Sequence, residues 1–204
     1  EKFDVDESLI STESISATVS SEMRRDAVVA VIVATLCMLV YIWFRFKDIR
    51  FAGSAIIALV HDVLVMLTGY ALIRISVGNT FIACILTIVG YSINDTIVIF
   101  DRIRENMQGM KKQTPETLAE VANRSLTQTL SRSLNTSITT IIMVLLLFIL
   151  GVSSIREFAL PLMIGLISGT YSSIFIAAAL WYVMKLHLGK DKLLKPAVAK
   201  TKKK

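Results

Sequence analysis

Five stretches of the sequence are apolar enough and long enough to cross a membrane, and polar stretches separate them. A transmembrane helix needs about 20 predominantly apolar residues. We place the spans at residues 26–45, 52–73, 80–100, 134–152 and 158–184. The last is longer than a bilayer requires, so we expect it either to tilt or to follow an interfacial end at Arg156 and Glu157. The pattern predicts an all-α polytopic membrane protein.

The stretch before the first span has a different pattern. Isolated isoleucines and valines alternate with serines over residues 1–19, which is typical of a strand and turn and predicts the C-terminal end of a truncated extracytoplasmic domain. This stretch is acidic and lacks the apolar core of a signal peptide. We expect a helix from Ser20 or Ser21, a membrane domain over residues 20–184 and a basic cytoplasmic tail over residues 185–204.

The polar stretch between the third and fourth spans contains a helix start. Thr114 is a favourable N-cap, Pro115 suits the first helical position, and Thr117 stands near the capping-box position. Apolar residues then recur at helical spacing, at Leu118, Val121, Ala122, Leu126 and Leu130. The pattern predicts a short amphipathic helix that lies along the membrane surface.

Composition agrees with a membrane protein. Hydrophobic residues make up 54% of the 204 residues, against about 45–50% in ordinary soluble domains. The two cysteines, Cys37 and Cys84, lie inside apolar runs and predict neither a disulfide framework nor a metal site.

Charge is distributed unevenly along the chain. Basic residues cluster after the first span, between the third and fourth, and after the fifth: Arg45, Lys47, Arg50, Arg102, Arg104, Lys111, Lys112, Arg124, Arg132 and the lysines from Lys185 to Lys204. By the positive-inside rule this side is cytoplasmic, so the N-terminal end is expected outside and the C-terminus in the cytoplasm. The tail is most simply a solvated charge run, with contact to anionic lipid or ribosomal RNA as the alternative.

Asp95 is the strongest candidate for chemistry, because an acidic side chain inside a span costs about 2.5–3.5 kcal/mol and is normally kept for a reason. On a helix it lies on the same side as Tyr91 and Ser92, and Asn94 adds a further polar group beside it. Burial disfavours an ionised carboxylate and a nearby cation favours it, so such a group suits a proton carrier. The alternative is structural: a protonated Asp95 that only hydrogen-bonds a neighbouring helix.

Arg132 begins the fourth span within a polar stripe. The stripe recurs every three to four residues, at Ser125, Thr129, Arg132, Asn135 or Thr136, and Thr139. It can line a hydrated cavity or face the helix that carries Asp95. A guanidinium there can pair with an ionised carboxylate and release a protonated one. An arginine that only anchors the span would instead reach the headgroups.

A second acidic residue lies inside a span, next to a histidine. His61 and Asp62 are adjacent, so on a helix their side chains point about 100° apart. They therefore cannot both line one narrow path, and a role in helix packing or hydration is favoured over direct proton transfer.

Small residues predict close helix contacts. Gly165, Gly169 and Ser173 form a row at four-residue spacing that lets another helix approach closely. Gly90 is expected to permit a similar approach just above Asp95. Packing is favoured over substrate contact for this row.

The sequence does not predict an enzyme. No nucleophile paired with a base, metal-ligand cluster or cofactor loop accompanies the polar residues of the spans. The membrane aspartates Asp62 and Asp95 invite comparison with intramembrane aspartyl proteases. That family has Tyr-Asp and Gly-x-Gly-Asp sequences, whereas the local sequences here are Val-His-Asp and Ser-Ile-Asn-Asp. We expect neither a cofactor nor a metal.

Several long motifs closely resemble the membrane region of SecF-type subunits in the SecD/SecF protein-export family. They are ALVHDVLV, GYSINDTIVIFDRIREN, NRSLTQTLSRSLNTSITT and REFALPLMIGLISGTYSS, and the resemblance runs from about Ser20 to about Met184. It implies one half of an RND-superfamily transporter, with six spans and a large extracytoplasmic α+β domain between the first two. The spans here would be the second to sixth.

The resemblance also implies a function and partners. A SecF-type subunit pairs with SecD and assists the SecYEG channel and the SecA motor, using the proton-motive force to move preprotein across the bacterial or archaeal cytoplasmic membrane. By motif, Asp95 matches the proton-path aspartate of GYSIND and Arg132 the arginine of LSR. The expected partners are SecD, SecYEG with SecA, the preprotein, protons and membrane lipids, and no nucleic acid.

Two other functions stay open at this stage. One is a different RND half that exports a lipid or small molecule, which efflux by the reconstituted protein would favour. The other is a structural scaffold for the translocon, in which the charges only set topology. Export that survives neutralisation of Asp95 and Arg132, but not disruption of Gly165 or Gly169, would favour the scaffold.

Overall fold

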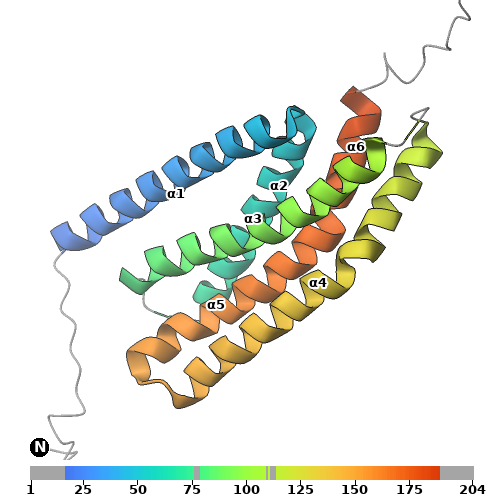
Figure 1. The fold of residues 1–204 in the computed structure, drawn as a ribbon. Helices are drawn as coiled ribbons and strands as arrows, with labels where there is room; N and C mark the ends of the chain where they lie inside the picture. Colours follow the sequence, from blue (N-terminus) through green and yellow to red (C-terminus); the bar gives the residue numbers. More distant parts are fainter. Residues whose placement is uncertain (1–16, 76–78, 109, 111–113, 189–204) are drawn as a thin grey trace, which may run out of the picture.

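The structure, a computed structural model, describes residues 17–75, 79–108, 110 and 114–188 (Figure 1). Its elements in this part of the chain are α1 (Ala17–Phe46), α2 (Ile49–Ile73), α3 (Asn79–Gln108), α4 (Pro115–Leu150), α5 (Ser153–Tyr171), the π-helical segment η2 (Ser172–Ala177) and α6 (Ala178–Leu188). Within the described residues, five helices are long and apolar enough to cross a membrane. The fifth is continuous through α5, η2 and α6. The predicted all-α membrane fold is confirmed.

Two predicted segments fall mainly outside the described residues. The external-domain remnant over residues 1–19 is described only from Ala17, which already belongs to α1. The basic tail over residues 185–204 is described only as far as Leu188, the end of α6.

The helices α2 to α6 form a bundle, and α1 leans on it mainly with its C-terminal end (Figure 1). Ile42 and Phe46 of α1 are buried, whereas Val33, Leu36 and Val40 earlier in the helix are more than half exposed. An apolar helix face that is exposed in the chain alone suits contact with lipid or with a further membrane helix. Most of α1 therefore lies outside the core of this bundle.

The buried residues of the bundle form two clusters. The first contains Phe46, Phe51, Phe100 and Trp181. The Phe51 ring centroid lies 5.0 to 5.3 Å from those of the other three. The second fills the other half of the bundle and includes Met66, Cys84, Ile88 and Leu166. Of the candidate polar residues, Asp62 of α2 and Ser92 and Asp95 of α3 are buried inside the bundle that these clusters hold together.

The charged ends of the helices meet at one end of the bundle. Lys185 at the end of α6 lies 3.3 Å from Asp48 before α2, and Arg45 at the end of α1 lies 2.8 Å from Asp101 of α3. Arg45 and Lys185, which the sequence pattern assigns to one side of the membrane, therefore lie at the same end of the bundle.

The region after Thr114 differs from its prediction. The capping box is confirmed: the Thr117 N–H donates to Thr114 Oγ1 at 3.3 Å, and the Thr114 N–H donates to Thr117 Oγ1 at 2.9 Å. The prediction of a separate surface helix is wrong, because α4 continues unbroken for 36 residues, or about 54 Å. No Gly or Pro interrupts it after Pro115, and its apolar residues Leu118 and Val121 pack into the bundle.

The row of small residues on α5 faces α3, as its spacing predicts. A Cβ added at Gly165 would overlap the Ile88 side chain, and one added at Gly169 would lie 3.2 Å from Ser92 Cβ. The prediction for Gly90 is wrong within this chain, because a Cβ there would meet no described atom within 4 Å.

Gly165→Leu is expected to destabilise the bundle by about 1–3 kcal/mol, because a side chain at this contact overpacks the α3–α5 seam. Thermal unfolding of the full-length subunit in detergent measures the effect. Gly90→Ala is the matched control and should be neutral or slightly stabilising, since alanine favours a helix over glycine. Equal unfolding temperatures for Gly165→Leu and the wild type would show that the contact is not tight.

Candidate functional site

Asp95 lies on α3 at the contact with α4 and is 8% exposed. Its Oδ1 accepts a hydrogen bond of 2.6 Å from Ser133 Oγ of α4. Its Oδ2 is buried and has no hydrogen-bond partner among the described residues. A buried polar atom without a partner costs about 1–3 kcal/mol. With no partner in the described part of the chain, this oxygen can accept a proton or a hydrogen bond from a further donor.

The face of α4 that packs into the bundle carries Ser133, one position after Arg132, and not Arg132 itself. Its buried residues follow a strict four-residue spacing: Ser125, Thr129, Ser133 and Ser137. Ser125 and Thr129 belong to the predicted stripe, but Arg132, Asn135, Thr136 and Thr139 are exposed in the chain alone. The Arg132 side chain makes no hydrogen bond or ion pair with any residue that the structure describes, and Ser133 is the residue that contacts Asp95.

Polar side chains that are exposed in the isolated chain lie next to Asp95 and Ser133 in the sequence. Asn94 is exposed next to Asp95, and Arg132 and Asn135 are exposed near Ser133. Threonine hydroxyls in this region are satisfied by their own helix, as when Thr136 Oγ1 donates to the Arg132 carbonyl at 2.9 Å. The side-chain amides of Asn94 and Asn135 and the guanidinium of Arg132 have no such partner among the described residues.

Among the residues that the structure describes, Asp62 of α2 is the other buried carboxylate, and both of its oxygens accept hydrogen bonds. It is fully buried. Oδ2 accepts from Ser92 Oγ and Ser172 Oγ, each at 2.6 Å, and Oδ1 accepts from Ser168 Oγ at 2.8 Å. His61 Nδ1 lies 3.1 Å from Oδ1. Asp62 therefore ties α2 to α3, α5 and η2.

His61 is more exposed than Asp62, although its Nδ1 still contacts the Asp62 carboxylate. The His61 side chain is 37% exposed, whereas that of Asp62 is 0% exposed. The contacts of Asp62 agree with the packing role that the sequence favours. Sequence reasoning missed Ser168 and Ser172, although small hydroxyl residues four positions apart on the last span were a usable signal.

Further hydroxyl contacts join the same helices. Ser173 Oγ lies 2.9 Å from Thr96 Oγ1 and donates to the Ser92 carbonyl at 3.2 Å. Ser137 Oγ of α4 accepts from Tyr91 Oη at 3.0 Å and from Thr170 Oγ1 at 2.7 Å. The segment of α3 around Asp95 is thus hydrogen-bonded to both α4 and the last span.

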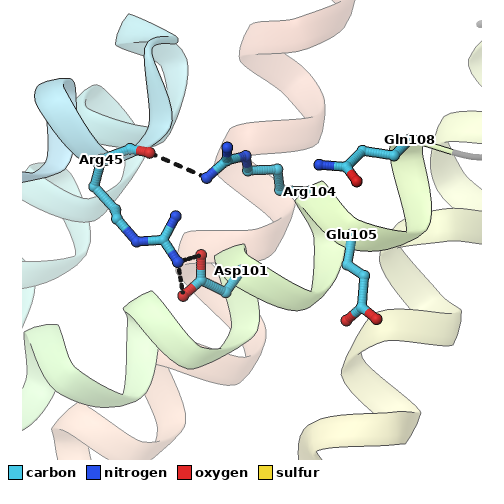
Figure 2. Close-up of a pocket in the computed structure, with 5 residues that line it drawn as sticks. All are labelled: Arg45, Asp101, Arg104, Glu105 and Gln108. Atoms are coloured by element: carbon cyan, nitrogen blue, oxygen red, sulfur yellow. Dashed lines mark hydrogen bonds and ion pairs between the residues drawn. The ribbon is translucent and has the colours of Figure 1, made fainter.

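A notch of about 340 Å³ lies at the charged end of the bundle, lined by Arg45, Asp101, Arg104, Glu105 and Gln108. Figure 2 shows the Arg45 guanidinium against both oxygens of Asp101, and Arg104 directed at the Arg45 carbonyl. Arg104 donates to this carbonyl at 3.1 Å. The carbonyls of a last helical turn lack intrahelical donors. These contacts therefore fix the end of α1 on α3, and we assign the notch no ligand.

Comparison with known proteins identifies the family. Residues 1–187 match the family model described as Protein export membrane protein SecD/SecF, C-terminal. The chain belongs to the SecD/SecF family. Within it, the chain is 51% identical over 172 residues to the protein translocase subunit SecF of Alicyclobacillus acidocaldarius, and 43% identical over 188 residues to that of Vibrio alginolyticus. These alignments cover 84% and 92% of the chain.

Solved structures of the SecD/SecF family agree with the fold. A crystal structure of SecDF, a translocon-associated membrane protein from Thermus thermophilus, superposes with a TM-score of 0.77 at 44% identity, over 84% of this chain and 23% of that one. The chain spans 56% and 58% of the two SecF relatives. It is thus a multi-pass membrane protein that represents part of the length of its SecD/SecF relatives.

Proposed function

We propose that this chain is the membrane part of a SecF-type subunit that assists preprotein export with the proton-motive force, and that Asp95 binds the transported proton. The observation that carries the proposal is that Oδ2 of buried Asp95 has no hydrogen-bond partner among the described residues. An intramembrane carboxyl group is costly to keep, and this one is held by a single hydroxyl donor. Proton transport gives a reason for both features. We regard the chain as a transport subunit and not as an enzyme.

Proton binding at Asp95 can be converted into a change in helix packing. A proton on Oδ2 neutralises the carboxyl group and needs no cation nearby. Loss of that proton leaves a buried carboxylate with one donor, which requires further charge compensation. Arg132 is next to Ser133 on α4, so a shift of α4 relative to α3 would bring a cation to Asp95. One charge that crosses 100 mV supplies about 2.3 kcal/mol.

The exposed polar side chains beside this contact support a membrane partner. Arg132, Asn94 and Asn135 are exposed in the isolated chain, and such groups rarely face lipid. A second protein surface over them would remove this cost. Relatives from Bacillus subtilis and Thermus thermophilus carry the name SecDF, and we therefore propose SecD as the partner at this face. SecYEG with SecA and the preprotein follow as partners of the whole assembly.

The distribution of charge supports one orientation. The end of the bundle that carries Arg45, Arg104 and Lys185 is richer in basic residues than the end that carries Arg74 and Arg156. By the positive-inside rule, we place this end in the cytoplasm. The N-terminal end of α1 is then outside.

Preprotein export into inverted membrane vesicles tests this function. Vesicles that contain SecYEG, SecA and SecD are compared with and without the full-length subunit, and with the proton gradient present or collapsed. We expect the subunit to increase export only while the gradient is present. A subunit that increases export equally after the gradient is collapsed would argue against use of the proton-motive force.

A further inference from the structure

We propose that Asp62 is a positioning residue for Asp95: its carboxylate holds the α3 segment 92–96 against η2 and so fixes where the Asp95 carboxyl group meets α4. This inference rests on the proposed role of Asp95 as the proton-binding group. It adds a residue on a different helix, α2, whose hydrogen bonds in the described chain go to other residues than Asp95.

The two buried carboxylates are held in opposite ways. Asp62 has close donors on both oxygens, from Ser92 of α3, Ser168 of α5 and Ser172 of η2. Within the described part of the chain, Asp95 has one hydroxyl donor, on Oδ1, and no hydrogen-bond partner on Oδ2. A saturated carboxylate resists displacement, because any shift of one helix breaks a charge-assisted hydrogen bond. Asp62 therefore holds its helices in place, close in the fold to the carboxyl group of Asp95 that is proposed to bind the proton.

Asp62 is linked to α3 in two ways, directly and through η2. Ser92 Oγ donates directly to Asp62, at a position one turn before Asp95. Ser172, which also donates to Asp62, is followed by Ser173, whose hydroxyl contacts the Ser92 carbonyl and Thr96 Oγ1. Both ends of the segment 92–96 are thus held.

The last span is adapted to this arrangement. Gly169 lets α5 approach Ser92 so closely that an added Cβ would lie 3.2 Å from Ser92 Cβ. Ser172 and Ser173 begin the π-helical segment η2. Short π-helical turns are uncommon inside α-helices and are frequent at functional sites. Both consecutive serines contribute to the network, Ser172 toward α2 and Ser173 toward α3.

Because Ser92 and Asp95 are on the same helix, the contact between Ser92 and Asp62 also affects the position of Asp95. Ser92 and Thr96 lie on one face of α3, and the Asp95 side chain points about 100° from Thr96 around the helix axis. A rotation of α3 that separates Ser92 from Asp62 therefore also moves Asp95 relative to Ser133. Without the Asp62 network, we expect the Asp95–Ser133 contact to be looser.

Infrared spectroscopy of the full-length subunit in complex with SecD tests this inference. The C=O stretch of protonated Asp95 is assigned at acidic pH as the band that Asp95→Asn removes. Its frequency reports the hydrogen bonding of that group. We expect the band to shift in Asp62→Asn and in Ser92→Ala, with gradient-dependent export reduced by about tenfold or more. Ser54→Ala is the control, since buried Ser54 bonds only the backbone of its own helix.

The possible results separate the two proposals. If Asp95→Asn removes no band and leaves export unchanged, the proposed role of Asp95 fails and this inference fails with it. If Asp95→Asn removes the band but Asp62→Asn and Ser92→Ala leave its frequency as in the wild type, only the positioning role is overturned. Should Asp62→Asn fail to fold, Ser92→Ala decides alone, because it removes one donor and keeps the carboxylate.

Discussion

Asp95→Asn is expected to reduce the gradient-dependent part of preprotein export by about a hundredfold or more, because positioned proton-transfer groups contribute on this scale. Asparagine keeps the shape of aspartate and can still accept from Ser133, but it cannot bind and release a proton at neutral pH. Export that does not depend on the gradient should remain. Export into inverted vesicles, measured with and without the gradient, separates the two parts.

Asp101→Asn is the matched control for this prediction. Asp101 lies on the same helix but is exposed and paired with Arg45 at the charged end of the bundle. An exposed pair contributes about 0–1 kcal/mol, so this variant should export like the wild type. Equal losses in the two variants would indicate a general effect of removing a carboxylate from α3.

Asp62→Leu is expected to destabilise the subunit by about 3–5 kcal/mol. The substitution leaves Ser92 Oγ and Ser168 Oγ without the partner to which they donate, and each buried hydroxyl that stays unpaired costs about 1–3 kcal/mol. Thermal unfolding of the full-length subunit in detergent measures the loss. It should exceed that of Gly165→Leu.

A combined variant identifies the source of this loss. Asp62→Leu together with Ser92→Ala, Ser168→Ala and Ser172→Ala removes both sides of the network, and replacing all partners by apolar groups is often nearly neutral. We expect the combined variant to recover most of the lost stability. A combined variant as unstable as Asp62→Leu alone would mean that the hydroxyl donors are not the reason for the loss.

The spans were predictable because each depends on local composition alone. A run of about 20 apolar residues has few alternatives to a membrane helix, and the start of α4 was encoded in Thr114 and Pro115. The error at α4 came from treating a polar stretch as the end of a helix. Polar residues do not stop a helix that lacks Gly and Pro, and α4 continues through them.

The arrangement of the candidate site was less predictable. Polar residues lie on several sides of α4, at Arg132, Ser133, Asn135 and Ser137, so periodicity alone could not decide which of them faces α3. The structure turns Ser133 inward and leaves Arg132 on the exposed side. The helix rotation is decided by packing against the other spans, which a single-helix pattern does not contain.

The set of serine hydroxyls that donate to Asp62 could not be predicted for a related reason. These serines are 30, 106 and 110 residues away along the chain. Their convergence depends on how α2, α3 and α5 pack. The sequence pattern identified Asp62 and the Gly165–Gly169 row separately. It did not predict that the helix carrying this row places Ser168 and Ser172 against the Asp62 carboxylate.

Proton flux tests most directly whether Asp95 carries the transported proton. The full-length subunit is reconstituted with SecD in vesicles that enclose a pH-sensitive dye, and the internal pH is followed after a gradient is imposed. We predict proton flux in the wild type and in Asp101→Asn, and none above protein-free vesicles in Asp95→Asn. Flux in Asp95→Asn equal to that of the wild type would contradict the proposed role of Asp95.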